Sequence, residues 1–185
     1  MSPDQATRRR GILLGVAAMT LIVTASNVLV QIPINDWLTW GALSYPVAFL
    51  VTDLTNRRLG PGPARRVVLA GFALAVVLSA YLATPRIAIA SGSAFLLAQL
   101  LDVQVFDRLR RGAWWRAPLV SSGLASVVDT ALFFGIAFAG TGLPWATWAL
   151  GDLGVKLAVA GAMLVPFRLL LGRTAPLPGT ATQAG

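Results

Sequence analysis

The chain has 185 residues, of which 56% are hydrophobic and 12% are charged, and its mean hydropathy is +0.73. This composition excludes an ordinary soluble domain and indicates a protein with several membrane spans. The formal net charge is +8. The chain has no Cys, which excludes disulfides, and no His, so the commonest metal ligands and the commonest general base are absent.

Six apolar stretches are long enough to cross about 30 Å of hydrocarbon as helices. In chain order they are residues 11–30, 40–56, 67–83, 87–106, 117–139 and 145–171. The sequence therefore predicts an all-α membrane protein with six transmembrane helices in one domain, residues 11–171. A basic segment, residues 1–10, precedes this domain, and a tail rich in Pro, Thr, Gly and Ala, residues 172–185, is expected to be disordered.

Arginines gather in alternate connections. Three precede the first stretch, four lie between the second and third, four lie between the fourth and fifth, and two follow near the end, whereas the other connections carry only Arg86. Loops rich in arginine stay in the cytoplasm. Both termini, including the basic segment and the tail, are therefore expected to be cytoplasmic.

Five ionisable residues lie within or at the edges of the apolar stretches: Asp53, Asp102, Asp129, Asp152 and Lys156, the only lysine of the chain. A charge near the centre of a bilayer costs roughly 2.5 to 3.5 kcal/mol on insertion scales, so these groups indicate a paired or hydrated interior with a function. By their depth, Asp129 and Lys156 belong to a polar layer near the membrane centre. Asp53 and Asp102 belong to an acidic layer nearer the cytoplasm.

Polar and aromatic residues recur on single helix faces. The second and fourth stretches share one spacing with acid and amide exchanged, in Phe49, Asp53 and Asn56 and in Phe95, Gln99 and Asp102. This similarity predicts a weak parallel repeat of the second and fourth helices. Two structural alternatives stay open, because Asp53 can form an interfacial ion pair with Arg57 and Asp152 can form an intrahelical pair with Lys156.

Several segments together resemble a known family of bacterial inner-membrane proteins. They are TWGALSYPVAFLVTDLTNRRLG (residues 39–60), RIAIASGSAFLLAQLLDVQVFDRLR (86–110), WWRAP (114–118), SVVDT (126–130) and DLGVKL (152–157). In this combined order they resemble the queuosine precursor transporter family, also called the vitamin uptake transporter family. The resemblance implies a multi-pass transporter that imports cyano- and aminomethyl-deazaguanine precursors for salvage into transfer RNA. The connection at residues 83–86 is shorter than in that family.

The candidate site residues suit a purine-like substrate. A carboxylate can accept the adjacent N–H donors of a guanine-like edge, for which Asp129 and Asp102 are candidates, with Asp53 and Asp152 in the same polar layers. Donors to a ring carbonyl are Asn27, Arg86, Gln99 and Lys156. Stacking walls are Trp40, Tyr45, Phe49, Phe95 and Trp148.

Two other functions are weighed against a transporter. The first alternative is a substrate-binding membrane subunit that needs an energising partner, and the second is an intramembrane enzyme in which Lys156 and Ser121 or Ser122 form a Ser-Lys dyad. The chain lacks a Gly-x-x-x-x-Gly-Lys phosphate loop, so this polypeptide is not expected to hydrolyse ATP. No cofactor, metal or direct nucleic-acid partner is expected. The expected partners are the substrate and the lipid bilayer, with the oligomeric state, a homodimer included, left open.

Overall fold

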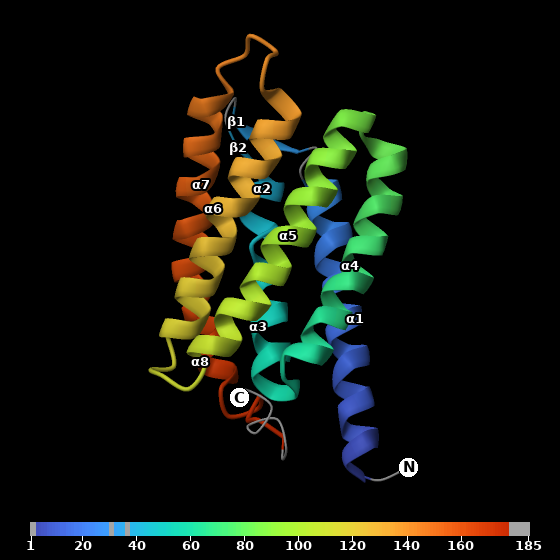
Figure 1. The fold of residues 1–185 in the computed structure, drawn as a ribbon, viewed down its shortest axis with the longest axis vertical. Helices are drawn as coiled ribbons and strands as arrows, with labels where there is room; N and C mark the ends of the chain where they lie inside the picture. Colours follow the sequence, from blue (N-terminus) through green and yellow to red (C-terminus); the bar gives the residue numbers. More distant parts are fainter. Residues whose placement is uncertain (1–2, 30–31, 36–37, 178–185) are drawn as a thin grey trace.

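The computed structural model describes residues 3–29, 32–35 and 38–177, and these residues are mainly helical (Figure 1). The helices of the described residues are α1 (Pro3–Leu29), α2 (Trp40–Ser44), α3 (Val47–Leu59), α4 (Pro61–Leu82), α5 (Pro85–Leu109), α6 (Arg116–Phe138), α7 (Trp145–Ala162) and α8 (Leu164–Leu170). Two short strands, β1 (Pro33–Asn35) and β2 (Leu38–Thr39), pair antiparallel between α1 and α2. The helical fold agrees with the sequence prediction, whereas this hairpin was not predicted.

Five helical segments of the described chain are long and apolar enough to cross a membrane. They are Gln5–Leu29, Pro61–Leu82, Pro85–Leu109, Arg116–Phe138 and Trp145–Leu170. The second predicted helix, residues 40–56, is instead divided into α2 and α3 by a turn at Tyr45 and Pro46. Proline has no backbone N–H and its ring clashes with the preceding helical turn, which explains the interruption. The prediction of one continuous second helix is therefore wrong, although α2 and α3 occupy the predicted stretch.

Glycine and proline shape the connection between α3 and α4. Gly60 ends α3 with a φ of 86°, a left-handed conformation that glycine adopts without steric cost. Pro61 and Pro63 follow in the first turn of α4, where the missing N–H groups need no intrahelical partner. α3 and α4 are thus joined by a single residue.

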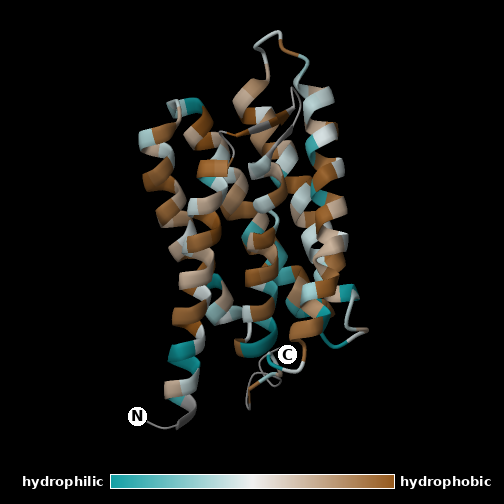
Figure 2. Cartoon of the chain, turned by 180° about the vertical axis from the view of Figure 1, so that it is seen from behind, coloured by the Kyte–Doolittle hydropathy of each residue, from teal (hydrophilic) through white to brown (hydrophobic). Residues whose placement is uncertain are grey.

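The first core packs α1 against α4 and α5 through Met19, Val67, Val68 and Phe95. A Cβ atom at Gly71 would lie only 2.5 Å from Met19 Cγ, so the close approach of α1 and α4 requires a glycine there. Many large apolar side chains are exposed on the helices. Figure 2 shows hydrophobic residues recurring along the length of the helices. This exposed apolar surface is what a bilayer requires.

The beginning of α1 and the short helix α8 lie at the same end of the bundle (Figure 1). Thr7 and Arg10 of α1 share a cavity with Arg58 of α3 and with Thr174. The backbone N–H of Leu177 donates a 3.1 Å hydrogen bond to Arg58 O, so the described part of the predicted tail lies against α3. Residues 178–185 of that tail lie outside the described residues.

We predict that the end carrying α8 faces the cytoplasm, because the arginine clusters of the connections lie on that side. A reporter fused after Arg173 should be active in the cytoplasm, and one inserted at residues 140–144 should be active in the periplasm. Fusion of paired cytoplasmic and periplasmic reporters at both sites measures this. A periplasmic signal after Arg173 would contradict the topology.

Candidate functional site

The interruption between α2 and α3 places Tyr45 inside the bundle. The backbone N–H of Tyr45 donates to Gly41 O at 2.9 Å, so the residue still closes the last turn of α2. Its hydroxyl donates a 3.2 Å hydrogen bond to Asp129 Oδ1 on α6. The sequence suggested Tyr45 only as a stacking wall, whereas the structure also makes it a hydrogen-bonding partner of an acid.

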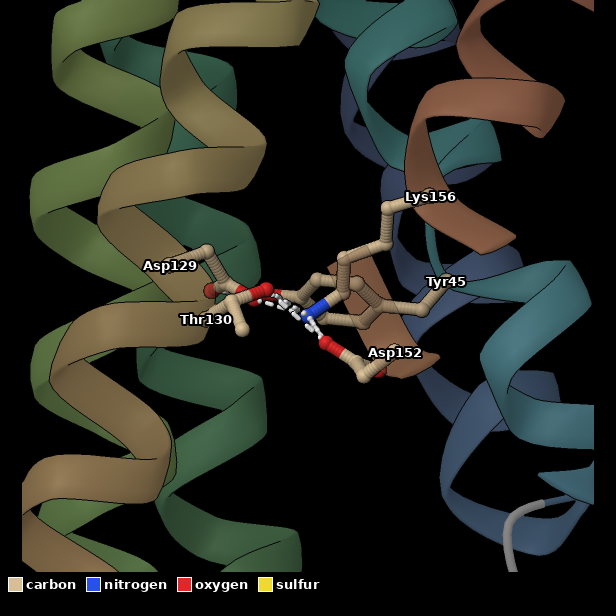
Figure 3. Close-up of polar contacts among 5 residues, drawn as sticks. All are labelled: Tyr45, Asp129, Thr130, Asp152 and Lys156. Carbon is tan, nitrogen blue, oxygen red and sulfur yellow. Dashed lines mark hydrogen bonds and ion pairs between the residues drawn. The ribbon is translucent and has the colours of Figure 1, made fainter. Parts of the chain in front are cut away.

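Lys156 of α7 lies between two aspartates (Figure 3). Its Nζ is 2.7 Å from Asp129 Oδ2 and forms a second ion pair with Asp152, one turn earlier on α7. Nζ also donates a 3.2 Å hydrogen bond to Thr130 Oγ1, and Thr130 in turn donates to Asp152 Oδ2 at 2.9 Å. The three donors of the ammonium group thus have three acceptors, which compensates for its burial.

This cluster links α6 to α7 and contacts the α2–α3 turn. Lys156 Nζ lies 5.8 Å from the centroid of the Tyr45 ring, within the range of a cation–π contact. With all three groups ionised, two carboxylates face one ammonium group, so the cluster carries a formal charge of −1. A ligand that supplies N–H donors would balance this excess of acceptors.

The cluster lines a cavity of about 200 Å³ between the helices. Small side chains at Gly41, Ala42, Ser91 and Ala94 leave the space, and Phe133 supplies an aromatic wall. The other lining residues are Ser26, Asn27, Tyr45, Asp129, Asp152 and Lys156. A concave site that combines apolar walls with a few convergent polar groups is typical of a small-molecule site.

A second polar layer lies deeper in the bundle, around Asp53 of α3 and Asp102 of α5. Both acids are buried, with exposures of 1% and 0%. Ser121 donates to Asp53 Oδ1 at 3.4 Å. The Ser122 hydroxyl of α6 lies 3.5 Å from Asp53 Oδ2 and 3.4 Å from Asp102 Oδ1, so its single proton is shared between the two carboxyl groups or donated to one of them.

The alternative of an interfacial ion pair between Asp53 and Arg57 does not hold among the described residues, where Asp53 contacts Ser121 and Ser122 instead. The predicted pairing of Asp152 with Lys156 does form, but Lys156 also binds Asp129 of α6. It is therefore more than an intrahelical pair. Ser121 and Ser122 bind acids and not Lys156, so the hypothetical Ser-Lys dyad is not assembled.

Between the two layers lie Gln99 of α5 and Ser126 of α6. Thr52 donates a 2.6 Å hydrogen bond to Gln99 Oε1. Gln99 Nε2 and Ser126 Oγ are buried and have no partner among the described residues. Ser122 and Asp129 are about 10 Å apart along α6, at 1.5 Å per residue, and Ser126 occupies the turn between them.

The predicted site residues fall into separate groups. Asn27, Asp129, Asp152 and Lys156 line the cavity. Phe49, Asp53, Gln99 and Asp102 lie buried outside its lining. The remaining four, Trp40, Arg86, Phe95 and Trp148, also lie outside the lining.

Each of those four has another environment. The guanidinium of Arg86 donates to Ile136 O and Ala139 O, at 2.8 and 2.7 Å, and so caps the end of α6. Trp148 meets Phe138 edge to face, Phe95 packs in the first core, and Trp40 is 49% exposed. The sequence did not single out Ser26, Ser91, Thr130 or Phe133, although Ser26 and Thr130 directly adjoin predicted site residues.

We expect Lys156→Ala to destabilise the protein by about 3 to 5 kcal/mol, because it leaves Asp129 and Asp152 without their cation. A triple variant, Lys156→Leu with Asp129→Asn and Asp152→Asn, should recover part of the loss, since no buried charge is left unpaired. Asp107→Asn removes the pair with Arg110 at the C-terminal end of α5 and should cost less than Lys156→Ala, because Arg110 keeps its hydrogen bond to Asn56 O. Unfolding in mixed detergent micelles measures all three. Equal stability of Lys156→Ala and the wild type would contradict this account of the cluster.

The chain is similar in sequence to a known family of transporters. A family model described as "Putative vitamin uptake transporter" matches residues 39–84 and 79–171. The chain is 37% identical over 175 residues to the "Queuosine precursor transporter" of Escherichia coli strain K12, covering 79% of each chain. It is 35% identical over 204 residues to the "Probable queuosine precursor transporter" of Haemophilus influenzae, covering 88% of this chain and 86% of the relative. No solved structure matches the chain. The family match covers α2 to α8, and together with the two relatives it shows that the chain belongs to the queuosine precursor transporter family, a family of membrane transporters and not of enzymes.

Proposed function

We propose that this protein is a bacterial inner-membrane importer of queuosine precursors, the cyano- and aminomethyl-deazaguanines, for salvage into transfer RNA. The observation that carries the proposal is the cavity beside the Asp129–Lys156–Asp152 cluster, in a chain related to proteins named queuosine precursor transporters. The cluster has one carboxylate more than its ammonium group balances. It therefore suits a ligand rich in N–H donors.

Asp129 is the residue that we assign to the guanine-like edge. Two adjacent N–H donors of such a ring can be accepted by one carboxylate, and burial makes this charge-assisted pair strong and selective for geometry. The same oxygens also bind Tyr45 and Lys156. The substrate must therefore replace at least one of these partners, while the rings of Phe133 and Tyr45 provide walls for a flat molecule.

This exchange suggests how occupancy can alter the helices. Lys156 keeps Asp152 as a partner when Asp129 is taken by the substrate, because Lys156 pairs with both aspartates. The ionic link between α6 and α7 would then weaken, whereas the pair within α7 would remain. A ligand shifts a conformational equilibrium only through such differential contacts.

The interrupted helix supports the same assignment. Transporters often bind substrate near the membrane centre beside discontinuous helices. At the break, backbone groups without helical hydrogen bonds are available to contact the substrate. Here α2 and α3 meet at Tyr45, which binds Asp129 and lines the cavity. A substrate-binding subunit that depends on an energising partner is the alternative that uses the same cavity.

Uptake by purified protein in liposomes tests the function. We expect liposomes with the wild-type protein to take up both radiolabelled deazaguanines, and guanosine to compete weakly because the cavity is small. Liposomes without protein are the control. Binding without uptake would favour the subunit that needs a partner, and neither binding nor uptake would contradict the proposal.

Substitutions at the cavity should separate binding from folding. We expect Asp129→Asn to weaken binding of the cyano precursor by at least about tenfold, or 1.4 kcal/mol, because the amide cannot accept both ring donors. Tyr45→Phe keeps the ring and loses the bond to Asp129, so its effect should be smaller, about two- to tenfold. Asp107→Asn is the matched control because Asp107 pairs with Arg110 at the other end of α5. Wild-type affinity in Asp129→Asn, measured by equilibrium binding in detergent, would place the site elsewhere.

A further inference from the structure

Asp53 and Asp102 do not line the substrate cavity, yet they are the most deeply buried acids of the described chain. They come from different helices, α3 and α5, and both lie beside the Ser122 hydroxyl of α6, whose oxygen is 3.5 Å from Asp53 Oδ2 and 3.4 Å from Asp102 Oδ1. A packing role alone would be met by neutral residues at lower cost, because each unpaired carboxylate loses its hydration on burial.

The charged groups around the pair are already engaged or do not reach it. On α3, Arg57 lies one turn away and forms no ion pair with Asp53 among the described residues. On α5, Asp107 pairs with Arg110, whose Nη1 also donates to Asn56 O at 3.4 Å. On α6 and α7, Asp129, Asp152 and Lys156 bind one another in the upper layer. No described cation therefore compensates for the two carboxyl groups.

Several buried polar atoms at or near the Asp53–Asp102 pair have no hydrogen-bond partner among the described residues. One oxygen of Asp102, Oδ2, has no donor in the described part of the chain. Gln99 Nε2 and Ser126 Oγ also lack partners there, although both residues have an exposure of 0%. Gln99 lies one turn from Asp102 on α5, and Ser126 one turn from Ser122 on α6, so both lie on the side of the substrate cavity. Buried polar groups are normally satisfied, so these three atoms provide positions that can bind a proton or a water molecule.

We propose that, if the protein imports queuosine precursors, the Asp53–Asp102 pair binds the proton that drives import. Two adjacent carboxyl groups without a cation are favoured when they share one proton, as in carboxyl dyads of enzymes. The proton reaches the pair from the outer side through the cavity, past Ser126 and Gln99. One proton enters with one substrate molecule and leaves to the cytoplasm, and no bond of the substrate changes.

The same pair closes the inner half of the bundle. With one proton shared, Asp53 and Asp102 attract each other and hold α3 against α5. After the proton leaves, two carboxylates repel each other and require water, which favours separation of α3 from α5 on the cytoplasmic side. Release of the proton therefore favours opening towards the cytoplasm, whereas a pair that carries no net charge, as in an Asn variant, lets the bundle open without a proton.

Accumulation in liposomes tests the pair. The probe is the neutral cyano precursor, with the membrane potential clamped to zero by potassium and valinomycin. One proton per substrate and an exterior one pH unit more acidic should give about tenfold accumulation, because one unit corresponds to about 1.36 kcal/mol. Asp102→Asn and Asp53→Asn should only equilibrate the substrate, while they keep substrate binding and counterflow exchange, which move no net proton. Asp107→Asn should accumulate like the wild type.

The possible results are distinct. Accumulation in both Asn variants equal to the wild type overturns the assignment, and so does loss of binding or counterflow in both, since the pair does not line the cavity. Wild-type uptake that follows a sodium gradient and ignores the pH gradient also overturns it, while the transport function stands. Absence of uptake and binding in the wild type contradicts the transport function itself.

A measurement that needs no substrate tests the shared proton even when the wild type shows neither uptake nor binding. Infrared spectroscopy of the purified protein should show the C=O band of a protonated buried carboxyl group. The band should be absent from the Asp53→Asn/Asp102→Asn double variant and present in Asp107→Asn. A wild-type spectrum without this band across the pH range of folded protein would overturn the shared proton.

Discussion

The burial of one ammonium group organises this molecule. Lys156 cannot be hydrated by lipid, so its three donors must find acceptors inside the bundle. Asp152 of the same helix supplies one, and Asp129 and Thr130 of α6 supply the others. The position of α7 against α6 therefore follows from the need to satisfy a charge, and the cavity lies at that contact.

The interruption of the second predicted helix depends on the same centre. A continuous helix through residues 40–56 would carry the Tyr45 side chain in a direction set by the helix alone. The turn before α3 instead lets its hydroxyl reach Asp129 while its ring approaches Lys156 and contacts Phe49 and Phe95 edge to face. The helix break at Pro46 thus places the Tyr45 side chain where it contacts both Asp129 of α6 and Lys156 of α7. Discontinuous helices of this kind line substrate sites in many transporters.

The two polar layers differ in how the charge of their carboxylates is balanced. The upper layer has a cation, an adjoining cavity and acceptors in excess, which fits the recognition of a donor-rich ligand. The lower layer has two acids, serine donors and no cavity lining, which fits a smaller species. Their separation along α6 is about two turns, short enough for Ser126 and a few waters to connect them.

The sequence alone determined the class of the protein. Its apolar stretches, with arginine in alternate connections, predicted a helical membrane bundle, and its combined motifs resembled the family that the comparisons then showed. These signals are local, because hydropathy and spacing are properties of single segments. The acids and the lysine were recognised as important for the same reason, since each is costly in lipid wherever its partner lies.

Only the tertiary structure determined which polar side chains contact one another. Nothing in the spacing of Asp129 and Lys156 shows that they meet, because the contact depends on how α6 and α7 are rotated about their axes. Packing likewise turned Arg86 towards the carbonyls that end α6, outside the cavity lining, and brought Asp53 to Ser121 and Ser122 rather than to Arg57. Helix rotation and crossing are set by side chains from distant segments, such as Met19 against Gly71, and these act together only in the folded bundle.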